Sequence, residues 1–285
     1  MNNDIYQVGP KIRMALPTLT SKEQSVVRYL LDKGSAIGQL TIAKAAQDNS
    51  VSDAMIVKIA KKLGYDGYRD LRDSLYGYSQ LAVSNLFEEF SPTDSASEIV
   101  DKVFRTAIQA LEETRAILRI DDFNAAVTAL YTAQQRDFYG VGGSSTIARD
   151  AAHKFLRIGI RSTAYDDPHM MMMSAALLSA QDVVLAISHS GQTSAILDAV
   201  RQAKRSGARL IALTNYNTSA LAREADIVLC STGRGSPLMG ENAAARIAQL
   251  NILDALFVCV ARQSSEDAER ALEKTMHSVQ KKRET

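Results

Sequence analysis

The sequence has few residues that could form disulfide bonds or bind metal ions, and it has no long apolar run. It contains two cysteines and no tryptophan among 285 residues. Cys230 and Cys259 lie far apart, with no histidine or cysteine at metal-ligand spacing, so we expect reduced thiols in a cytoplasmic protein, and no metal or cofactor. The nearest approach to a membrane span, residues 170–180, is too short to cross a bilayer. The first residues carry no signal-peptide pattern, and we expect no membrane partner.

The net charge of +1 hides an uneven distribution of charge. Residues 1–80 hold 11 Lys and Arg against 8 Asp and Glu, whereas the rest of the chain holds 22 and 24. A total near zero therefore does not exclude a nucleic-acid partner for the N-terminal part. Apolar residues make up 46% and charged residues 23%, as in ordinary folded domains. At roughly 150 residues per domain, the length predicts about two domains.

The N-terminal part is predicted to form short, capped helices. Ser21 followed three residues later by Gln24 has the form of a capping box. A second helix is expected over residues 41–48, and a third begins after Ser52. Residues 49–51 between them form a tight polar turn with one apolar residue. A helix, a short turn and a capped helix together are typical of a helix-turn-helix motif.

The third helix presents a polar face once its apolar stripe is assigned to the core. Ile56, Ile59 and Leu63 form that stripe. Lysines on the opposite face can neutralise phosphates, and the first residues of a recognition helix meet base edges. The alternative is an ordinary helical bundle with a solvated lysine face. The predicted DNA-binding residues are Ser52, Asp53, Met55, Lys58, Lys61 and Lys62.

The rest of the chain alternates between strand and helix patterns. Helices are expected over 98–118 and 121–134, after a less regular stretch at 85–97 that we interpret as a linker. The expected strands are 137–141, 161–165, 183–188, 210–214 and 227–230. This alternation predicts a parallel sheet with helices on both faces. We therefore expect an all-α helix-turn-helix domain over 1–84, the linker, and an α/β domain over 98–285.

The first loop with chemical content is Gly-Val-Gly-Gly-Ser-Ser at residues 140–145. Glycines let the backbone approach an anion, and the following helix supplies N–H groups at its positive end. The pattern also resembles a dinucleotide fingerprint, with Asp166 and Asp167 about 20 residues further on, where a ribose-binding acid would lie. Ser145, however, occupies the place of the third glycine. By itself this loop does not decide between the two.

The second loop is Ser-His-Ser-Gly-Gln-Thr at residues 188–193, between an apolar strand and a helix. Hydroxyl and amide side chains around one glycine, at a helix N-terminus, suit a phosphate monoester. A single serine or threonine there would usually be only a helix cap. Here several occur together, one strand–helix unit after the glycine–serine loop. We predict a phosphate-binding loop.

The two loops, GVGGSS and SHSGQT at this spacing, resemble the sugar isomerase (SIS) domain, a flavodoxin-like module that binds phosphosugars. Residues 51–72, VSDAMIVKIAKKLGYDGYRDLR, resemble the helix-turn-helix segment of RpiR-type bacterial transcription regulators. That family joins the two modules in this order across nearly the whole chain. The runs HKFLRIGIR and AYDDPHMMMMSAALL are also similar to sequences of this family.

The resemblance implies which residues bind a phosphosugar. Four hydroxyl side chains would hold the phosphate, four residues would shape the loops, and two histidines could touch the sugar or make only local contacts. A glutamate at the start of the last long helix matches one that moves the substrate proton in isomerases of this superfamily, although charge at a helix N-terminus explains it equally. The set is Ser144, Ser188, Ser190 and Thr193, then Gly142, Gly143, Ser145 and Gln192, then His169 and His189, and Glu241.

We expect a DNA-binding transcriptional regulator of sugar catabolism genes rather than an enzyme. A phosphosugar such as ribose 5-phosphate or allose 6-phosphate would relieve repression by a homodimer or homotetramer on a near-palindromic operator. The alternative is a phosphosugar isomerase with a helical extension, which would not need the first 80 residues. A nicotinamide-dependent oxidoreductase ranks third because the fingerprint glycine is missing.

Overall fold

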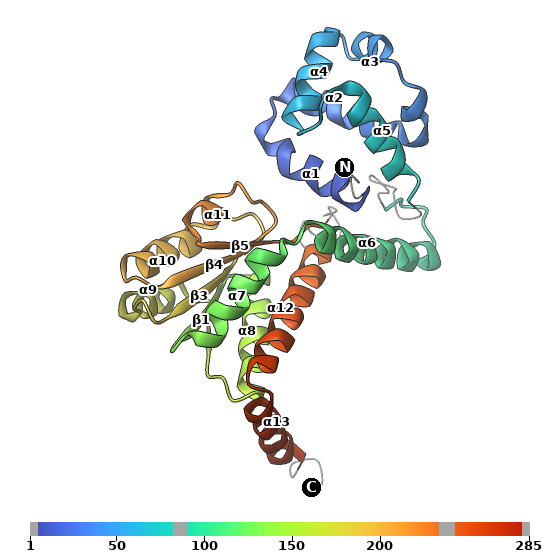
Figure 1. Ribbon diagram of the computed structural model, residues 1–285. Helices are drawn as coiled ribbons and strands as arrows, with labels where there is room; N and C mark the ends of the chain where they lie inside the picture. Colours follow the sequence, from blue (N-terminus) through green and yellow to red (C-terminus); the bar gives the residue numbers. More distant parts are fainter. Residues whose placement is uncertain (1–4, 82–89, 234–242, 281–285) are drawn as a thin grey trace. The chain divides into compact units, whose positions relative to one another are not determined.

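The computed structural model describes residues 5–81, 90–233 and 243–280. Its internal contacts divide the chain into two compact units, the first ending at Ile117 and the second beginning at Leu118. The first unit is all helical, and the second contains a sheet (Figure 1).

The helices of the first unit enclose one apolar core. Val26, Leu30, Ile56 and Leu71 are fully buried in it. The helices are η1 (Ile5–Gln7), α1 (Val8–Ala15), η2 (Leu16–Thr18), α2 (Ser21–Asp32), η3 (Gly34–Gln39), α3 (Ile42–Asp48), α4 (Asp53–Lys62), α5 (Tyr68–Ser79) and α6 (Ala96–Ile117).

Helices α3 and α4 and the turn between them form the predicted helix-turn-helix motif. Ser50 in the turn has a φ of 51°. The Val51 N–H then donates to the Ala46 carbonyl at 3.0 Å, and the Val51 side chain packs against the helical core. The Ser52 hydroxyl caps α4 by accepting a hydrogen bond from the Met55 N–H at 3.3 Å. The predicted capped helix after Ser52 is confirmed.

The predicted capping box at the start of α2 is wrong by one residue. Thr20, not Ser21, is the N-cap, and Glu23, not Gln24, is its partner. The Thr20 N–H donates to the Glu23 carboxylate at 2.9 Å. Both pairs match the sequence pattern, but Glu23 also accepts a hydrogen bond from Lys62 on α4 at 2.6 Å. This long-range ion pair favours the observed register, and local sequence does not reveal it.

Helix α6 belongs by its contacts to the helical unit. Glu113, 1% exposed, accepts hydrogen bonds from the Tyr78 hydroxyl at 2.5 Å and from Gln109 at 2.8 Å, and it forms an ion pair with Arg13. These bonds connect α1, α5 and α6. The domain boundaries predicted from the sequence instead place α6 in the α/β domain of residues 98–285. The contacts in the structure place it in the helical unit.

The last two residues of the predicted linker, 96 and 97, belong to helix α6 in the structure. Helix α6 begins at Ala96, because the Ser95 N–H donates to the Glu98 carboxylate at 2.7 Å and so caps the first turn. Residues 82–89 lie outside the described part of the chain.

The second unit is built on five parallel strands in the order β2-β1-β3-β4-β5, the flavodoxin-like order. The strands are β1 (Arg136–Gly140), β2 (Thr163–Tyr165), β3 (Val183–Ile187), β4 (Arg209–Thr214) and β5 (Ile227–Cys230). The predicted parallel sheet is confirmed, with small differences at strand ends.

Helices cover both faces of this sheet (Figure 1). On one face α7, α8 and α12 share a core with Phe138 and Leu185, and on the other α9, α10 and α11 share a core with Tyr139 and Ala186. The helices are α7 (Ile120–Thr132), α8 (Gly143–Arg157), α9 (Pro168–Leu177), α10 (Ser194–Arg205), α11 (Ala220–Glu224), α12 (Ala243–Gln263) and α13 (Ser265–Gln280).

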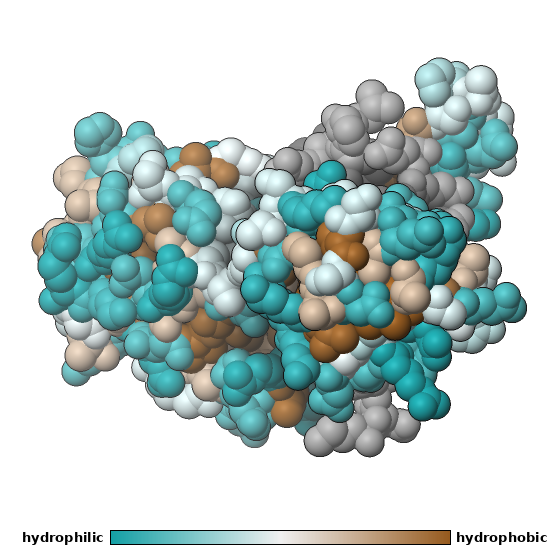
Figure 2. Space-filling model, turned by 90° about the horizontal axis from the view of Figure 1, so that it is seen from above, coloured by the Kyte–Doolittle hydropathy of each residue, from teal (hydrophilic) through white to brown (hydrophobic). Residues whose placement is uncertain are grey.

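Helix α12, not residues 170–180, is the segment that comes nearest to a membrane span. By length and composition it could cross a bilayer, with a mean hydropathy of 1.6 over its most apolar window, 44% of which is buried inside the structure. Leu253, Leu256 and Val260 belong to the core on one face of the sheet, so part of the apolar surface of this helix packs inside the α/β unit. On the surface shown in Figure 2, hydrophobic residues form patches bordered by hydrophilic ones.

We expect Glu23→Gln to remove an acid-sensitive part of the stability. The Lys62 hydrogen bond, followed by that of the Thr20 backbone, lowers the pKa of Glu23 from 4.5 to about 2. The ion pair therefore contributes above pH 4.5 and is lost as the pH falls towards 2. Glutamine keeps the cap acceptor, so the loss should be small, roughly 1 kcal/mol at pH 7, because Lys62 stays partly exposed to water.

Urea unfolding followed by circular dichroism between pH 2 and 7 measures this difference. Asp73→Asn is the control, because this exposed carboxylate pairs with its neighbour Arg72 at the surface. Equal acid dependence in the wild type and in Glu23→Gln would contradict the assigned role of Glu23.

Candidate functional site

Both predicted ligand-binding loops lie at the carboxyl edge of the sheet. Strand β1 pairs directly with β3, with Gly140 opposite Ile187. The loops that follow these strands therefore start from adjacent positions, about 5 Å apart as in any paired strands.

The helices after these two loops lack the side-chain caps that their neighbours have. Gly142 precedes α8 and Thr193 precedes α10, and neither provides a side-chain cap. By contrast, α9 and α11 are capped by Asp167 and Ser219. At the start of α8 the Ser144 and Ser145 N–H groups donate to the Val141 and Gly142 carbonyls at 3.2 and 3.0 Å. The positive end of each helix dipole still favours an anion at these N-termini. Among α8 to α11, the uncapped helices are those at the predicted phosphate loops.

The hydroxyl groups of the second loop lie close together. Ser188 Oγ is 3.0 Å from Thr193 Oγ1 and accepts a hydrogen bond from the Gly191 N–H at 3.1 Å. Ser190 Oγ accepts from the Gln192 N–H at 3.2 Å. Ser188 is buried, whereas Ser190 and Gln192 are exposed. The Thr193 side chain thus turns towards Ser188 instead of capping α10.

The second loop packs against the end of β4 and the start of α11. Gly191 has a φ of +62°, and a Cβ there would lie 3.0 Å from Thr214 Oγ1 and closer still to the Ser219 side chain. The Gly191 carbonyl accepts from the Leu221 N–H at 3.0 Å. The His189 carbonyl accepts from the Thr214 hydroxyl at 3.2 Å. Only glycine suits this position, and the loop is held by its backbone.

The first loop directs its two serines differently. Gly142 has a φ of +59°. Ser145 is 8% exposed and donates its hydroxyl to the Gly142 carbonyl at 2.7 Å, so it holds the turn. Ser144 is half-buried and Gly143 is exposed at the start of α8. The Ser144 side chain is therefore the predicted phosphate contact from this loop.

The remaining predicted ligand residues have different surroundings. His169 is exposed in the first turn of α9, which follows β2 at the same edge of the sheet. The half-buried ring of His189 packs edge-on against Tyr216, with centroids 6.1 Å apart. Glu241 lies outside the described residues. Ligand contacts for these three residues stay predictions.

The two acidic residues on which the dinucleotide-binding alternative depends have other partners in the structure. Asp166 forms an ion pair with Arg149, and Asp167 accepts a hydrogen bond from the Met170 N–H at 2.9 Å. A salt bridge and a helix cap therefore account for both carboxylates.

A chain of buried, hydrogen-bonded polar residues that is not among the predicted site residues lies beside the second loop. The Asn215 N–H donates to the His189 carbonyl at 3.1 Å, and the Asn215 side chain accepts from the Ser231 hydroxyl. Gln249 on α12 donates to Ser231 Oγ at 3.1 Å. Asn215 and Ser231 directly follow β4 and β5, so the rule that ligand sites form at carboxyl strand ends could have found them.

Arg246 was also absent from the predicted set. The structure places its guanidinium group beside the first loop: a Cβ on Gly143 would lie 3.5 Å from Arg246 Cζ and 3.6 Å from both Nε and Nη1. Arg246 Nε is buried without a hydrogen-bond partner among the described residues. More than 100 residues separate the two positions in the sequence, so no local pattern indicates their contact.

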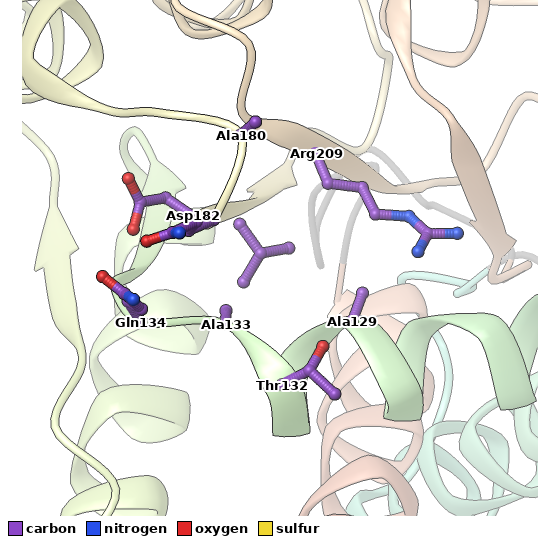
Figure 3. Close-up of a pocket in the computed structure, with 9 residues that line it drawn as sticks. Ala129, Thr132, Ala133, Gln134, Ala180, Asp182 and Arg209 are labelled. Carbon is purple, nitrogen blue, oxygen red and sulfur yellow. The ribbon is translucent and has the colours of Figure 1, made fainter.

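A separate cavity of about 320 Å³ lies at the opposite edge of the sheet (Figure 3). Gln134, Asp182 and Arg209 line it, at the amino ends of the strands. The Asp182 carboxylate accepts from the Ser179 N–H at 2.7 Å and the Gln135 N–H at 2.9 Å. The polar groups here therefore hold the turns that lead into β1 and β3.

The thiols have no reactive surroundings. Cys230 and Cys259 are both free. Burial raises the pKa of the Cys230 thiol to about 11, so it stays protonated at neutral pH and is a weak nucleophile.

The predicted DNA-binding residues on α4 do not all face solvent. Asp53, Lys58 and Lys61 are exposed. Lys62 is exposed as well, but its amine lies 2.6 Å from the buried Glu23 carboxylate, so this lysine also forms an ion pair within the helical unit. The basic face of this helix therefore rests chiefly on two lysines.

The residues at the start of α4 also have structural roles. Met55 is half-buried and packs against the helical core, and the Ser52 hydroxyl caps the helix. Ser52 nevertheless stays exposed at the end that would meet base edges.

Two family models match the chain. The model "Helix-turn-helix domain, rpiR family" covers residues 6–81, and the model "SIS domain" covers residues 129–259. The chain is 42% identical over 268 residues to the HTH-type transcriptional regulator RpiR of Escherichia coli strain K12, covering 94% of this chain and 90% of that protein. It is 33% identical over 264 residues to an HTH-type transcriptional regulator of Caldanaerobacter subterraneus subsp. tengcongensis, covering 93% and 94%.

A solved structure shares the arrangement over nearly the full length. The Vibrio vulnificus NanR protein complexed with ManNAc-6P has a TM-score of 0.60 and 25% identity, covering 95% of this chain and 97% of that one. Fold and motifs together define a transcriptional regulator in which a helix-turn-helix domain precedes a SIS domain. The chain belongs to the RpiR family of transcriptional regulators. It is a regulator and not a phosphosugar isomerase.

We expect Gly191→Ala to destabilise the second unit by roughly 2–4 kcal/mol, because a left-handed φ and a steric overlap add. The double variant Gly191→Ala/Ser219→Gly should recover part of the loss, since glycine is tolerated at a helix N-cap and removes the nearest contact. Chemical denaturation measures both. A loss below 0.5 kcal/mol for the single variant would contradict the tight packing of this loop.

Proposed function

We propose that the first turns of α8 and α10 bind the phosphate group of a phosphosugar, and that this binding changes the affinity of the helix-turn-helix domain for operator DNA. The observation that carries the proposal is the pair of helix N-termini without side-chain caps at adjacent strand ends. Hydroxyls from Ser144, Ser188, Ser190 and Thr193 would complete the phosphate contacts. N–H groups and hydroxyls together match the many acceptor oxygens of a phosphate.

The class of effector follows from the site and from a structural neighbour. The Vibrio vulnificus NanR protein was solved with ManNAc-6P, which supports a sugar phosphate as the effector of this chain as well. We favour a pentose or hexose phosphate, with ribose 5-phosphate and allose 6-phosphate as the first compounds to test. His169 would contact the sugar, because α9 starts at the same edge of the sheet.

The DNA-binding part of the proposal places α4 in the major groove. Lys58 and Lys61 would contact phosphates, and Ser52 and Asp53 would lie near base edges. Two such helices in a homodimer or homotetramer, in the cytoplasm, would read a near-palindromic operator. The effector relieves repression only if it binds the DNA-free conformation more tightly than the DNA-bound one.

Ser190→Ala should weaken sugar-phosphate binding by about tenfold, the contribution of one hydrogen bond to a charged group. DNA affinity without ligand should stay within about twofold, because Ser190 lies outside the helix-turn-helix domain. Thermal shift against a panel of sugar phosphates, with band shifts on operator DNA, measures both quantities. Ser206→Ala, at the far end of α10, is the control. An unchanged response in Ser190→Ala would place the phosphate elsewhere.

Lys58→Ala should reduce the dependence of DNA binding on salt. Each phosphate contact contributes about one to the slope of log K against log salt concentration, so the slope should fall by about one for each protomer. Lys204→Ala, a substitution in the second unit, is the control and should leave the slope unchanged. DNA binding that is absent or independent of salt in the wild type would contradict the proposed interface.

A further inference from the structure

The two predicted phosphate loops contain no Asp, Glu, Lys or Arg. The residues assigned to the two loops are glycines, serines, a threonine, a glutamine and a histidine. Arg149, which lies on α8, forms an ion pair with Asp166. A phosphate dianion in this site would therefore meet dipoles and hydroxyls but no fixed counter-ion from the loops. The structure places one cation, from a different helix, beside the first loop.

Arg246 brings its guanidinium group to the start of α8. The distances from a Cβ on Gly143 to Arg246 Cζ, Nε and Nη1 are nearly equal, 3.5 to 3.6 Å. Such equal distances mean that the flat face of the guanidinium group lies over the first residue of α8. The donor edges of the group then point sideways from the loop, where a ligand oxygen can reach them.

The position of Arg246 is set by the fold. Gln249, one turn later on α12, is 1% exposed and donates to Ser231 Oγ at 3.1 Å. Ser231 is bonded to Asn215, which in turn donates to the His189 carbonyl in the second loop. Helix α12 is thus fastened to one phosphate loop while its arginine lies on the other.

The charge of Arg246 is not balanced by an anionic side chain among the described residues. A cation beside the N-terminus of a helix meets the positive end of the helix dipole, which is unfavourable. No ion pair of Arg246 is found in the part of the chain that the structure describes, and its buried Nε has no acceptor there. Buried donors without acceptors are rare in folded proteins and require an explanation. An anion at the donor edge of the guanidinium group, beside the start of α8, would satisfy both.

We infer that Arg246 is the counter-ion of the effector's phosphate, bridging α12 to the two loops when the effector is bound. The inference rests on the proposed phosphosugar site and adds a residue to it. It also assigns the recognised form of the effector: a dianionic phosphate, for which a planar guanidinium group is the matching donor. Effector binding would then fasten α12 to the first loop as well as to the second.

The test is isothermal titration of the full-length protein with ribose 5-phosphate and allose 6-phosphate, with ribose and allose as uncharged controls. Arg246→Gln should weaken binding of the phosphorylated compounds by roughly ten- to a hundredfold. Arg246→Lys, which keeps the charge without the planar fork, should fall in between. Arg262→Gln, at the other end of α12, is the matched control and should stay within about twofold.

Two further measurements separate a counter-ion from a purely structural arginine. The second proton of a phosphate leaves near pH 6, so wild-type affinity should rise between pH 5.5 and 7.5, and Arg246→Gln should lose most of that rise. The ligand-free variant should unfold at or above the wild-type temperature, because a cation is removed from a positive helix end. If Arg246→Gln fails to fold, the pH dependence retained by Arg246→Lys decides the question in its place.

The outcomes distinguish the inference from the function on which it rests. Wild-type binding of a sugar phosphate together with unchanged affinity and pH dependence in Arg246→Gln would overturn the role of Arg246 and leave the phosphosugar site standing. Absence of wild-type binding to every sugar phosphate tested would overturn both.

Discussion

The parallel pairing of β1 with β3 is the constraint on which the ligand site depends. Both strands are buried along their whole length, so their register is fixed by packing on both faces of the sheet. Because each strand leads through a short loop into a helix, the pairing starts both loops at adjacent positions, from which α8 and α10 run to opposite faces of the sheet. Neither helix receives a side-chain cap. Strand pairing therefore sets the position of the proposed anion site, to which the polar loop residues would add contacts.

Helix α12 connects this site to the rest of the α/β unit. Gln249, Ser231 and Asn215 form a buried hydrogen-bonded chain between that helix and the second loop. Buried polar groups are costly unless each finds a partner, so such a chain permits few alternative packings. A ligand that also contacts Arg246 would add a connection between α12 and the first loop. Allosteric control requires such a contact, one that differs between the ligand-free and ligand-bound states.

The helical unit shows a similar use of buried charge. Glu113 connects three helices through Arg13, Tyr78 and Gln109, and Glu23 joins the start of α2 to the end of α4. Breaking one partner of such a pair leaves an uncompensated charge, so these contacts specify the arrangement of helices more than they add stability. The same contact that positions α4 also places one of its lysines in an ion pair.

The sequence by itself determined the helix-turn-helix motif, the parallel sheet and the two loops, because each is written in a local pattern: a cap, a hydrophobic period, or a run of glycine and hydroxyl residues. Only the tertiary structure decided which of two matching capping boxes forms, that Lys62 is paired, and that Arg246 lies beside Gly143. These outcomes depend on contacts between residues tens to more than a hundred positions apart. Local periodicity carries no information about such contacts, since the packing of whole helices and strands brings those side chains together.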